Sequence, residues 1–186
     1  MIKQKRNYIK EQKRNHLIKA LIWAAVILII VITGFVLLKT RTSYFTVVAS
    51  VLVLPFALHI TRFLAYGKYK DPCPKQAALL ENMKGSYGLY HSAIIPDNTC
   101  TLYFEHIIAT TKNIYFISSN KEMIQKAKPI LTLRLENKGI QINKLHFIYA
   151  ESGKTIKNIK IRVEKDACLT GEALKNTMKI IDGMLM

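Results

Sequence analysis

Residues 20–38 read ALIWAAVILIIVITGFVLL, and residues 42–61 read TSYFTVVASVLVLPFALHIT. The first stretch has no charged side chain, and the only ionisable groups of the second are Tyr44 and His59. A helix rises about 1.5 Å per residue, so each stretch would span roughly 30 Å, the thickness of a hydrocarbon core. The sequence therefore predicts two transmembrane helices, over 20–38 and 42–63, joined as an antiparallel hairpin.

The basic residues around these stretches predict their orientation. Seven Lys and Arg residues precede the first stretch, whereas only Lys39 and Arg41 separate the two stretches. Arg62 and three lysines up to Lys75 follow. Because Lys and Arg collect on the cytoplasmic side, we expect a multi-pass protein of the inner (plasma) membrane with both termini cytoplasmic. A cleaved signal peptide does not fit, since a second apolar stretch follows at once.

The segment over 1–19 is expected to be a basic cytosolic arm that approaches the bilayer as a helix. Basic residues near a membrane surface each gain about 1 kcal/mol from anionic headgroups. Membrane lipids are therefore one predicted partner. The same charges can contact nucleic-acid phosphates, or serve only to set the topology.

A linker over 65–73 leads to a cytosolic domain over 74–186, because Pro72 and Pro74 prevent the second helix from continuing. The residue patterns predict the order α-β-β-β-α-β-β-α, an α+β domain with a mixed sheet. Helices are expected over 74–86, over 121–139 with an interruption at Pro129, and over 170–185 with Thr170 as cap. Strands are expected over 88–95, 100–110, 114–119, 144–150 and 158–163.

Two of these strands carry further expectations. The short turn at 111–113 joins 100–110 to 114–119 as a hairpin. Alternation along the first of them places Tyr103, Glu105, Ile107 and Ala109 on one face, and Phe104, His106, Ile108 and Thr110 on the other. The apolar run over 144–150 is typical of a strand buried on both faces.

The segment EHIIAT over 105–110, followed by KNIYFI over 112–117, resembles the nuclease-related domain (NERD) family of the Mrr-like restriction-endonuclease superfamily. In that family an Asp-His pair opens a hydrophobic strand, and the next strand ends in a Glu-x-Lys catalytic signature. The resemblance covers roughly residues 74–150 in element order and implies a restriction-endonuclease-like fold. It also implies metal-dependent phosphodiester cleavage where the signature is intact.

The signature is not intact in this chain. The Asp of the family falls on Glu105, the Glu on Ser118 and the Lys on Asn120. Cleavage of this type needs carboxylates to hold Mg²⁺ and a cation to organise the attacking water. We therefore expect a catalytically degenerate domain without a cofactor. The alternative is a membrane-bound, Mg-dependent nuclease that uses Asp97 and Glu105 as its metal pair.

Other candidate sites are weaker. His91, His106 and His146 lie in predicted strands, where a histidine more often packs than ligates, although together with Glu105 they could converge on a metal. A phosphate-binding loop is excluded at 153–155, because the glycine that it requires is an isoleucine at position 148. Three widely spaced cysteines predict free thiols rather than a disulfide framework or a zinc site: Cys73, Cys100 and Cys168.

Five basic side chains around the predicted strand 158–163 form the candidate binding surface: Lys154, Lys157, Lys160, Arg162 and Lys165. In the simpler interpretation they guard a solvated sheet edge against aggregation. In the functional one they bind an acidic protein partner, a headgroup or a nucleic acid.

The leading hypothesis is a membrane-tethered cytosolic interaction module with a degenerate nuclease-like domain. It would bind a protein, anionic lipid or nucleic acid rather than transform a substrate. Besides the nuclease, a further alternative is an accessory subunit of a membrane complex, in which the two helices form the interface. Gly34, Ala49 and Ser50 would permit close helix approach there.

Overall fold

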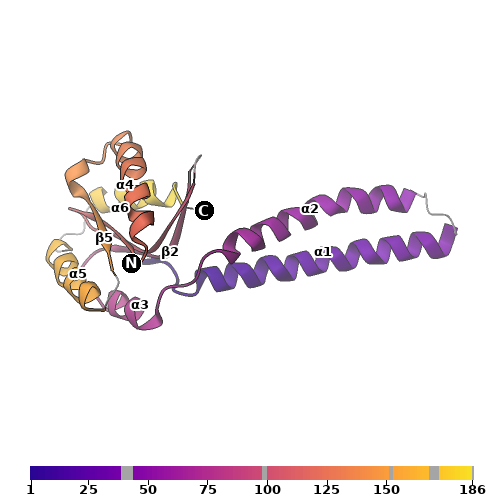
Figure 1. Ribbon diagram of the computed structural model, residues 1–186, viewed down its shortest axis with the longest axis horizontal. Helices are drawn as coiled ribbons and strands as arrows, with labels where there is room; N and C mark the ends of the chain where they lie inside the picture. Colours follow the sequence, from indigo (N-terminus) through magenta and orange to yellow (C-terminus); the bar gives the residue numbers. More distant parts are fainter. Residues whose placement is uncertain (39–43, 98–99, 151–152, 168–171, 186) are drawn as a thin grey trace. The chain divides into compact units, whose positions relative to one another are not determined.

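The computed structural model describes residues 1–38, 44–97, 100–150, 153–167 and 172–185 (Figure 1). The chain divides into two compact units: Ile9–Lys70 forms one, and Met1–Tyr8 joins Asp71–Met186 in the other. The expected arm over 1–19 is therefore not a separate element. Its first residues belong to the α/β unit, whereas the rest lies in a helix.

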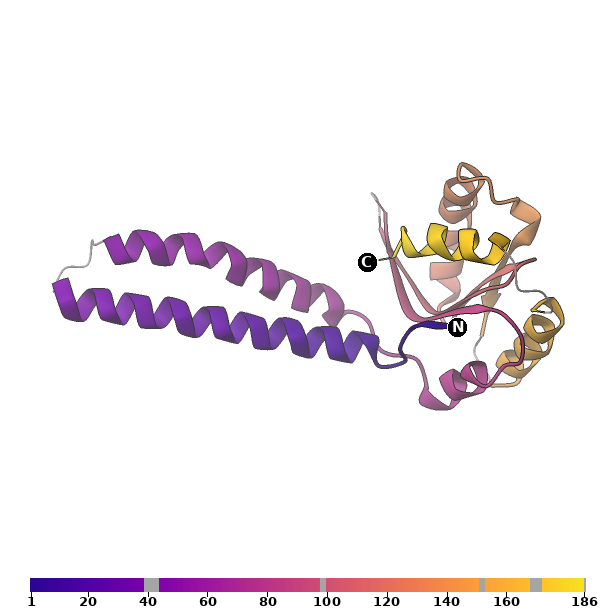
Figure 2. The ribbon, with the colours of Figure 1, turned by 180° about the vertical axis from the view of Figure 1, so that it is seen from behind.

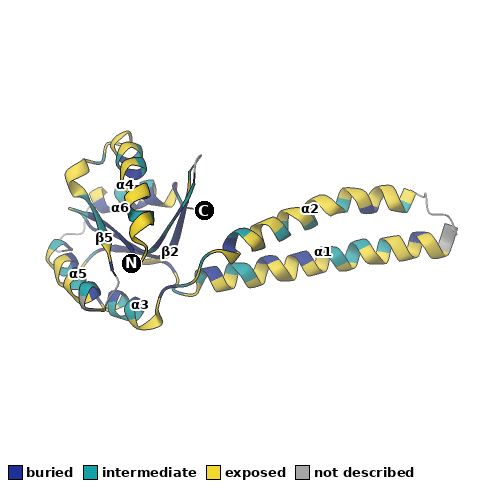
Figure 3. Ribbon diagram, viewed as in Figure 1, coloured by how far each residue is buried: buried dark blue, intermediate teal, exposed yellow. Residues whose placement is uncertain are grey.

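The helical unit consists of α1 (Tyr8–Leu38) and α2 (Tyr44–Gly67), which run side by side (Figures 1 and 2). Both helices are long and apolar enough to cross a membrane, and both extend beyond the apolar stretches that predicted them. Their most apolar windows are only 11% and 6% buried. Large apolar side chains such as Leu28, Phe35 and Leu54 are exposed, as Figure 3 shows in yellow along both helices. The expected turn at 39–41 lies outside the described residues.

Close helix approach in this unit depends on Gly34. A Cβ atom at Gly34 would lie 2.6 Å from the Cβ of Phe45 on α2, so a larger residue would push the helices apart. Ala49 is buried, as expected for a contact position. Ser50 is exposed, and its hydroxyl donates to the Thr46 carbonyl of its own helix. Two of the three predicted small residues thus lie where the helices meet.

Polar contacts hold the other end of the helix pair. The Lys13 ammonium of α1 donates to the Tyr69 carbonyl at 3.0 Å and to the Gly67 carbonyl at 3.5 Å. The Nδ1 atoms of His16 and His59 lie 3.2 Å apart, and the His16 ring stacks on Tyr66. A cation beside the carbonyls that end α2 is favoured by the helix dipole.

The α/β unit contains a five-stranded mixed sheet in the order β1-β2-β3-β4-β5. The strands are β1 (Ile2–Gln4), β2 (Gly88–Pro96), β3 (Thr101–Ala109), β4 (Ile114–Ser118) and β5 (Leu145–Tyr149). The helices are α3 (Pro74–Glu81), α4 (Lys121–Glu136), the short 3-10 helix η1 (Ile142–Lys144), α5 (Gly153–Asp166) and α6 (Glu172–Asp182). Strands β2, β3 and β4 form an antiparallel meander, while β1 is parallel to β2 and β5 is parallel to β4. The predicted β3–β4 hairpin is confirmed.

Helices cover the sheet on both faces (Figures 1 and 2). On one face Phe104 and Phe116 pack with residues of α4 and α6, including Leu131 and Met178. On the other face the core comprises Leu80 of α3, Leu89, Ile108, Tyr115, Ile117 and, from α5, Ile156, Ile159 and Val163. Most residues of β2 and β4 and the second half of β3 are consequently buried, as the dark blue of Figure 3 shows.

The prediction of a strand over 158–163 is wrong, because these residues lie in α5. Ile159, Ile161 and Val163 alternate as in a strand. The buried set is instead Ile156, Ile159, Val163 and Ala167, whose spacing of three or four residues is that of one helix face, while Ile161 is 54% exposed. The element order therefore ends in β-α-α rather than in β-β-α.

Two further expectations need correction. The strand over 144–150 is not buried on both faces: β5 is the last strand of the sheet and is only half-buried. Helix α4 continues through Pro129 without a break. Thr170, the expected cap of the last helix, lies outside the described residues.

Candidate functional site

A backbone irregularity occupies the middle of β2. Ser92 has φ 55°, the left-handed region that residues with a side chain seldom adopt. It lies between the register pairs His91↔His106 and Ala93↔Phe104, opposite Glu105. Strain of this kind persists only where the surrounding structure holds it, and it concentrates at functional sites.

The irregularity changes which side chains share a face, so the predicted alternation along β3 is wrong. Phe104 packs in the same core cluster as Ile107 and Ala109, whereas Ile108 packs in the cluster on the opposite face. Strand β2 switches in step, since Ala93 and Tyr90 share one cluster although they are three residues apart. Both strands therefore change face around Ser92 and Glu105.

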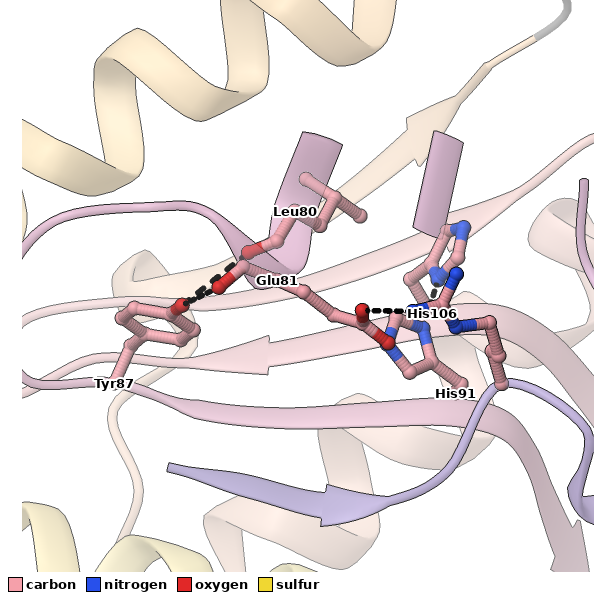
Figure 4. A network of polar contacts seen from close by, with 6 residues as sticks. Leu80, Glu81, Tyr87, His91 and His106 are labelled. Carbon is pink, nitrogen blue, oxygen red and sulfur yellow. Dashed lines mark hydrogen bonds and ion pairs between the residues drawn. The ribbon is translucent and has the colours of Figure 1, made fainter. Parts of the chain in front are cut away.

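Two histidines meet beside this switch. The Nδ1 atoms of His91 and His106 lie 2.8 Å apart, and both side chains are fully buried (Figure 4). A hydrogen bond at this distance needs one donor and one acceptor, so one Nδ1 carries a proton and the other does not. The pair cannot be doubly charged, because two imidazolium rings would bring two N–H groups together.

A carboxylate and a guanidinium complete what we call the buried histidine cluster: Arg6, Glu81, His91 and His106. Glu81 Oε1 lies 3.4 Å from His91 Nε2, and the other carboxylate oxygen accepts from Arg6 at 2.8 Å. Glu81 ends α3, and the Tyr87 hydroxyl donates to the Glu81 carbonyl at 3.1 Å (Figure 4). The negative charge of Glu81 favours the His91 tautomer with its proton on Nε2, and in that tautomer Nδ1 accepts from His106.

Burial keeps both rings neutral. It lowers the pKa of His91 to about 4, with a smaller contribution from the Arg6 charge. It lowers the pKa of His106 to about 3, with a smaller contribution from His91. The Nε2 atoms of His91 and His106 both lack a hydrogen-bond partner among the described residues, so Glu81 Oε1 lies 3.4 Å from His91 Nε2 without forming a hydrogen bond to it.

Polar groups flank the irregularity on both strands. The Ser92 hydroxyl donates to Asp71 Oδ1 at 2.9 Å, and its carbonyl accepts from the Gln4 amide of β1. The Ser119 hydroxyl donates to Glu105. Burial, with the charge of Glu105 next in size, raises the pKa of Tyr103 well above its usual value. The charge of Asp71 contributes to the same pKa shift of Tyr103, so Tyr103 lies within reach of both carboxylates.

The structure does not bring Asp97 and Glu105 together. Asp97 follows the last residue of β2, and its backbone N–H donates to the Cys100 carbonyl at the turn. The pair Pro96↔Thr101 lies four residues before Glu105 on β3, which corresponds to about 13 Å at the usual rise of a strand. A single Mg²⁺ requires ligand oxygens at about 2.1 Å, so this pair cannot share one ion.

The two other signature positions serve the fold. Ser118 is 2% exposed and its hydroxyl accepts from the backbone N–H of Asn120. Asn120 is the N-cap of α4: its Oδ1 accepts from the Met123 backbone N–H at 3.1 Å. Neither residue supplies the carboxylate or the cation of the nuclease signature.

The three strand histidines do not converge. His146 lies on β5, where its ring stacks on Tyr115, while His91 and His106 lie between β2 and β3. Over the described part of the chain, no group of three or more His, Cys, Asp or Glu side chains could hold a metal ion. Neither Cys73 nor Cys100 forms a disulfide, and Cys168 lies outside the described residues.

The predicted basic surface lies on α5 rather than on a strand. Lys160 donates to the Asn82 carbonyl at 3.3 Å and lies 3.8 Å from Glu164 one turn on. Lys157, Arg162 and Lys165 are exposed. The backbone of Lys154 belongs to the same helix, while its side chain lies outside the described part of the chain. The positive charges therefore belong to a solvated helix face.

Arg162 joins a second surface feature, which we call the β5 groove. It has a volume of about 530 Å³ and is lined by Lys121, Ile124, Gln125, Lys128, Leu145, His146, Phe147, Ile148, Tyr149 and Arg162. All five residues of β5 take part, together with one side of α4 and one residue of α5. Three lining side chains are cationic, and the described lining includes no Asp or Glu.

Comparison with known proteins places this chain in no group: no family model, curated protein or solved structure matches it. Sequence patterns had not indicated Arg6, Glu81 or Lys128. The sequence does place one histidine in each of two strands joined by a turn, at positions that pair when the strands align: His91 and His106.

Proposed function

We propose that this protein is a membrane-anchored binding module whose cytosolic α/β domain has a nuclease-like arrangement without nuclease chemistry. The anchor consists of α1 and α2, which are apolar, sufficiently long and mostly exposed. An exposed apolar surface of this size is costly in water and favourable in lipid.

The sheet supports a hairpin anchor with both flanks on one side. Strand β1 precedes α1 in the chain, yet it pairs with β2, which follows α2. If the helices cross the bilayer, the residues on either side of them must meet in one compartment. The basic residues before α1 favour the cytoplasm as that compartment.

The restriction-endonuclease-like resemblance is supported by the order of elements. Helix α3, the β2–β3–β4 meander, helix α4 and the parallel strand β5 follow one another as the resemblance implies. The identity of this fold stays a proposal, because it depends on element order and a short motif.

The structural roles of Ser118 and Asn120 support a binding function rather than a catalytic one. The first is buried and the second caps α4, so both positions of the missing signature stabilise the domain. The alternative pair, Asp97 and Glu105, is separated along β3. Among the described residues, no group of three or more His, Cys, Asp or Glu side chains is placed to hold a metal ion.

A cleavage assay on the full chain in lipid nanodiscs tests the proposal. Plasmid DNA, single-stranded DNA and RNA are incubated with Mg²⁺ or Mn²⁺, and we expect no cleavage above a protein-free control. Cleavage that Glu105→Ala or Asp97→Ala abolishes would establish the nuclease instead. Extraction of the membrane fraction at alkaline pH tests the anchor, since an integral protein stays in the pellet.

A further inference from the structure

We infer that the β5 groove binds an extended acidic peptide segment, which adds to the sheet as a sixth strand next to β5. This inference deepens the proposed function, because it names the binding surface and the class of partner. It starts from the open edge: β5 pairs with β4 on one side and is the last strand of the described sheet.

The geometry of the groove suits a strand. Helix α4 packs on one face of the sheet through Ala127 and Leu131, and α5 packs on the opposite face through Ile156 and Ile159. The groove has lining residues from both helices and from every position of β5. It therefore runs along the edge of the sheet rather than over one of its faces, and its side walls are α4 and α5.

The backbone of β5 supplies the recognition elements. An edge strand presents alternating N–H and C=O groups that another strand can pair with, and proteins usually protect such an edge. Here no strand covers β5 in the described chain, and the side chains on it are only half-buried. A peptide that adds to this edge gains main-chain hydrogen bonds together with apolar contact to Leu145, Phe147 and Ile148.

Charge selects the kind of peptide. Lys121 and Lys128 lie on α4 seven residues apart, two helical turns along the same side, and Arg162 faces the groove from α5. With no Asp or Glu in the described lining, the groove is locally positive on both walls. Carboxylates at successive positions of an added strand point to opposite faces of the sheet, so they meet one wall each.

A peptide fits these features better than a nucleic acid. Nucleic-acid grooves combine many phosphate contacts with aromatic platforms for base stacking. This groove has three cations, and two of the aromatic rings on its floor are already stacked on rings of β4: His146 on Tyr115, and Phe147 on Phe116. Backbone hydrogen-bond groups in a row match a polypeptide, whereas a phosphate chain has acceptors only.

Binding of a fluorescent hexapeptide with glutamates in adjacent pairs (Glu-Glu-Val-Glu-Glu-Val), so that each pair presents one carboxylate to each wall, to the full chain in neutral nanodiscs tests this. We expect binding that weakens with salt and falls at least tenfold with Lys128→Glu or Arg162→Glu. Lys126→Glu is the matched control, because Lys126 is an exposed residue of α4 outside the groove. The same peptide methylated on alternate backbone nitrogens should not bind, since it lacks strand hydrogen bonds.

Hydrogen exchange distinguishes strand addition from other occupants. Amides of β5 that point to the open edge should exchange more slowly when the peptide is bound. Absence of peptide binding, equal binding of the methylated peptide, or unchanged β5 exchange would each overturn the inference. So would tighter binding of single-stranded DNA or anionic vesicles at the same residues. Because nuclease activity is measured separately, failure here without cleavage leaves the proposed binding function standing.

Discussion

The rings of His91 and His106 face one another inside the sheet at an Nδ1–Nδ1 distance of 2.8 Å, beside a serine in the left-handed region. The pair is neutral because burial lowers the pKa of both rings to about 4 and about 3. In the unfolded chain each histidine returns to a pKa near 6.5. The two states of the protein therefore bind different numbers of protons in mildly acidic solution.

This difference predicts a loss of stability in acid. As the pH falls from about 6.5 towards 4, the unfolded chain takes up protons that the folded cluster refuses, so the free energy of unfolding decreases. We expect a loss on the order of several kcal/mol by pH 4, since each pKa unit corresponds to about 1.4 kcal/mol. Urea unfolding of the full chain in detergent, followed across this pH range, measures it.

His91→Gln tests the assignment to the cluster. Between pH 6 and 4.5, the unfolding free energy of the variant should fall less steeply with pH than that of the wild type. The difference in slope corresponds to about one proton, because one of the two buried rings is gone. His146→Gln, which removes an imidazole outside the cluster, is the matched control. A pH dependence in His91→Gln equal to that of the wild type would show that the pair does not control acid stability.

Asn120→Ala should destabilise the α/β domain by roughly 0.5–2 kcal/mol, because it removes the side-chain acceptor at the start of α4. Asn120→Asp should retain the stability, since aspartate caps equally well. Thermal melts of the two variants compare them. A neutral Asn120→Ala would mean that the cap contributes nothing and that the residue is retained for another reason.

Introducing the Glu-x-Lys signature should not create an enzyme. In the double variant Ser118→Glu with Asn120→Lys, a carboxylate is buried at a position that is 2% exposed and the α4 cap is lost. Burying an unpaired charge is strongly unfavourable, so we expect a destabilised protein without Mg²⁺-dependent cleavage. Cleavage by a stable double variant would show that only these two residues separate the domain from an active nuclease.

Phe104→Ala and Ile108→Ala should each cost roughly 2–5 kcal/mol, because both side chains are fully buried, on opposite faces of the sheet. Glu105→Gln should be nearly neutral, since an amide oxygen can still accept from the Ser119 hydroxyl. Melting temperatures of these variants, with and without Mg²⁺, test these stabilities and whether Glu105 binds a metal ion. A metal-induced rise that Glu105→Gln removes would identify Glu105 as a ligand.

Labelling in cells tests the orientation predicted from the basic residues. In a variant with its native cysteines replaced by serine, Thr40→Cys should react with a membrane-impermeant maleimide added outside. A cysteine placed after Asp182 should react only after the cells are lysed. Reversed labelling would contradict the cytoplasmic position of both termini.

The sequence predicted the long-range order of this fold better than its details. The apolar stretches, the β2–β3–β4 meander and α4 follow from strong local patterns. The error over 158–163 arose because Ile159, Ile161 and Val163 fit a strand while Ile156 and Val163 fit a helix, and only packing distinguishes the two. The strand at Ile2–Gln4 could not be foreseen, since its partner lies beyond both apolar stretches.

The histidine cluster could be foreseen only in part. Pairing across the meander places His91 opposite His106, and that register follows from the length of the turn. The contribution of Glu81 and Arg6 depends on how α3 and the residues before α1 return to the sheet. The left-handed backbone at Ser92 interrupts the alternation of side chains along the strand. The faces assigned to residues beyond it from sequence alternation are therefore wrong, and the hydrophobic pattern does not show this interruption.

The pairing of Ile2 with Leu89 also sets an order of events during synthesis. At about 5–20 residues per second, the ribosome needs roughly 4–17 s after adding the first of these residues to reach the second. During that interval both apolar helices are synthesised and β1 has no partner. The sheet can therefore be completed only after both helices have been made, and once completed it joins the segment before α1 to the segment after α2.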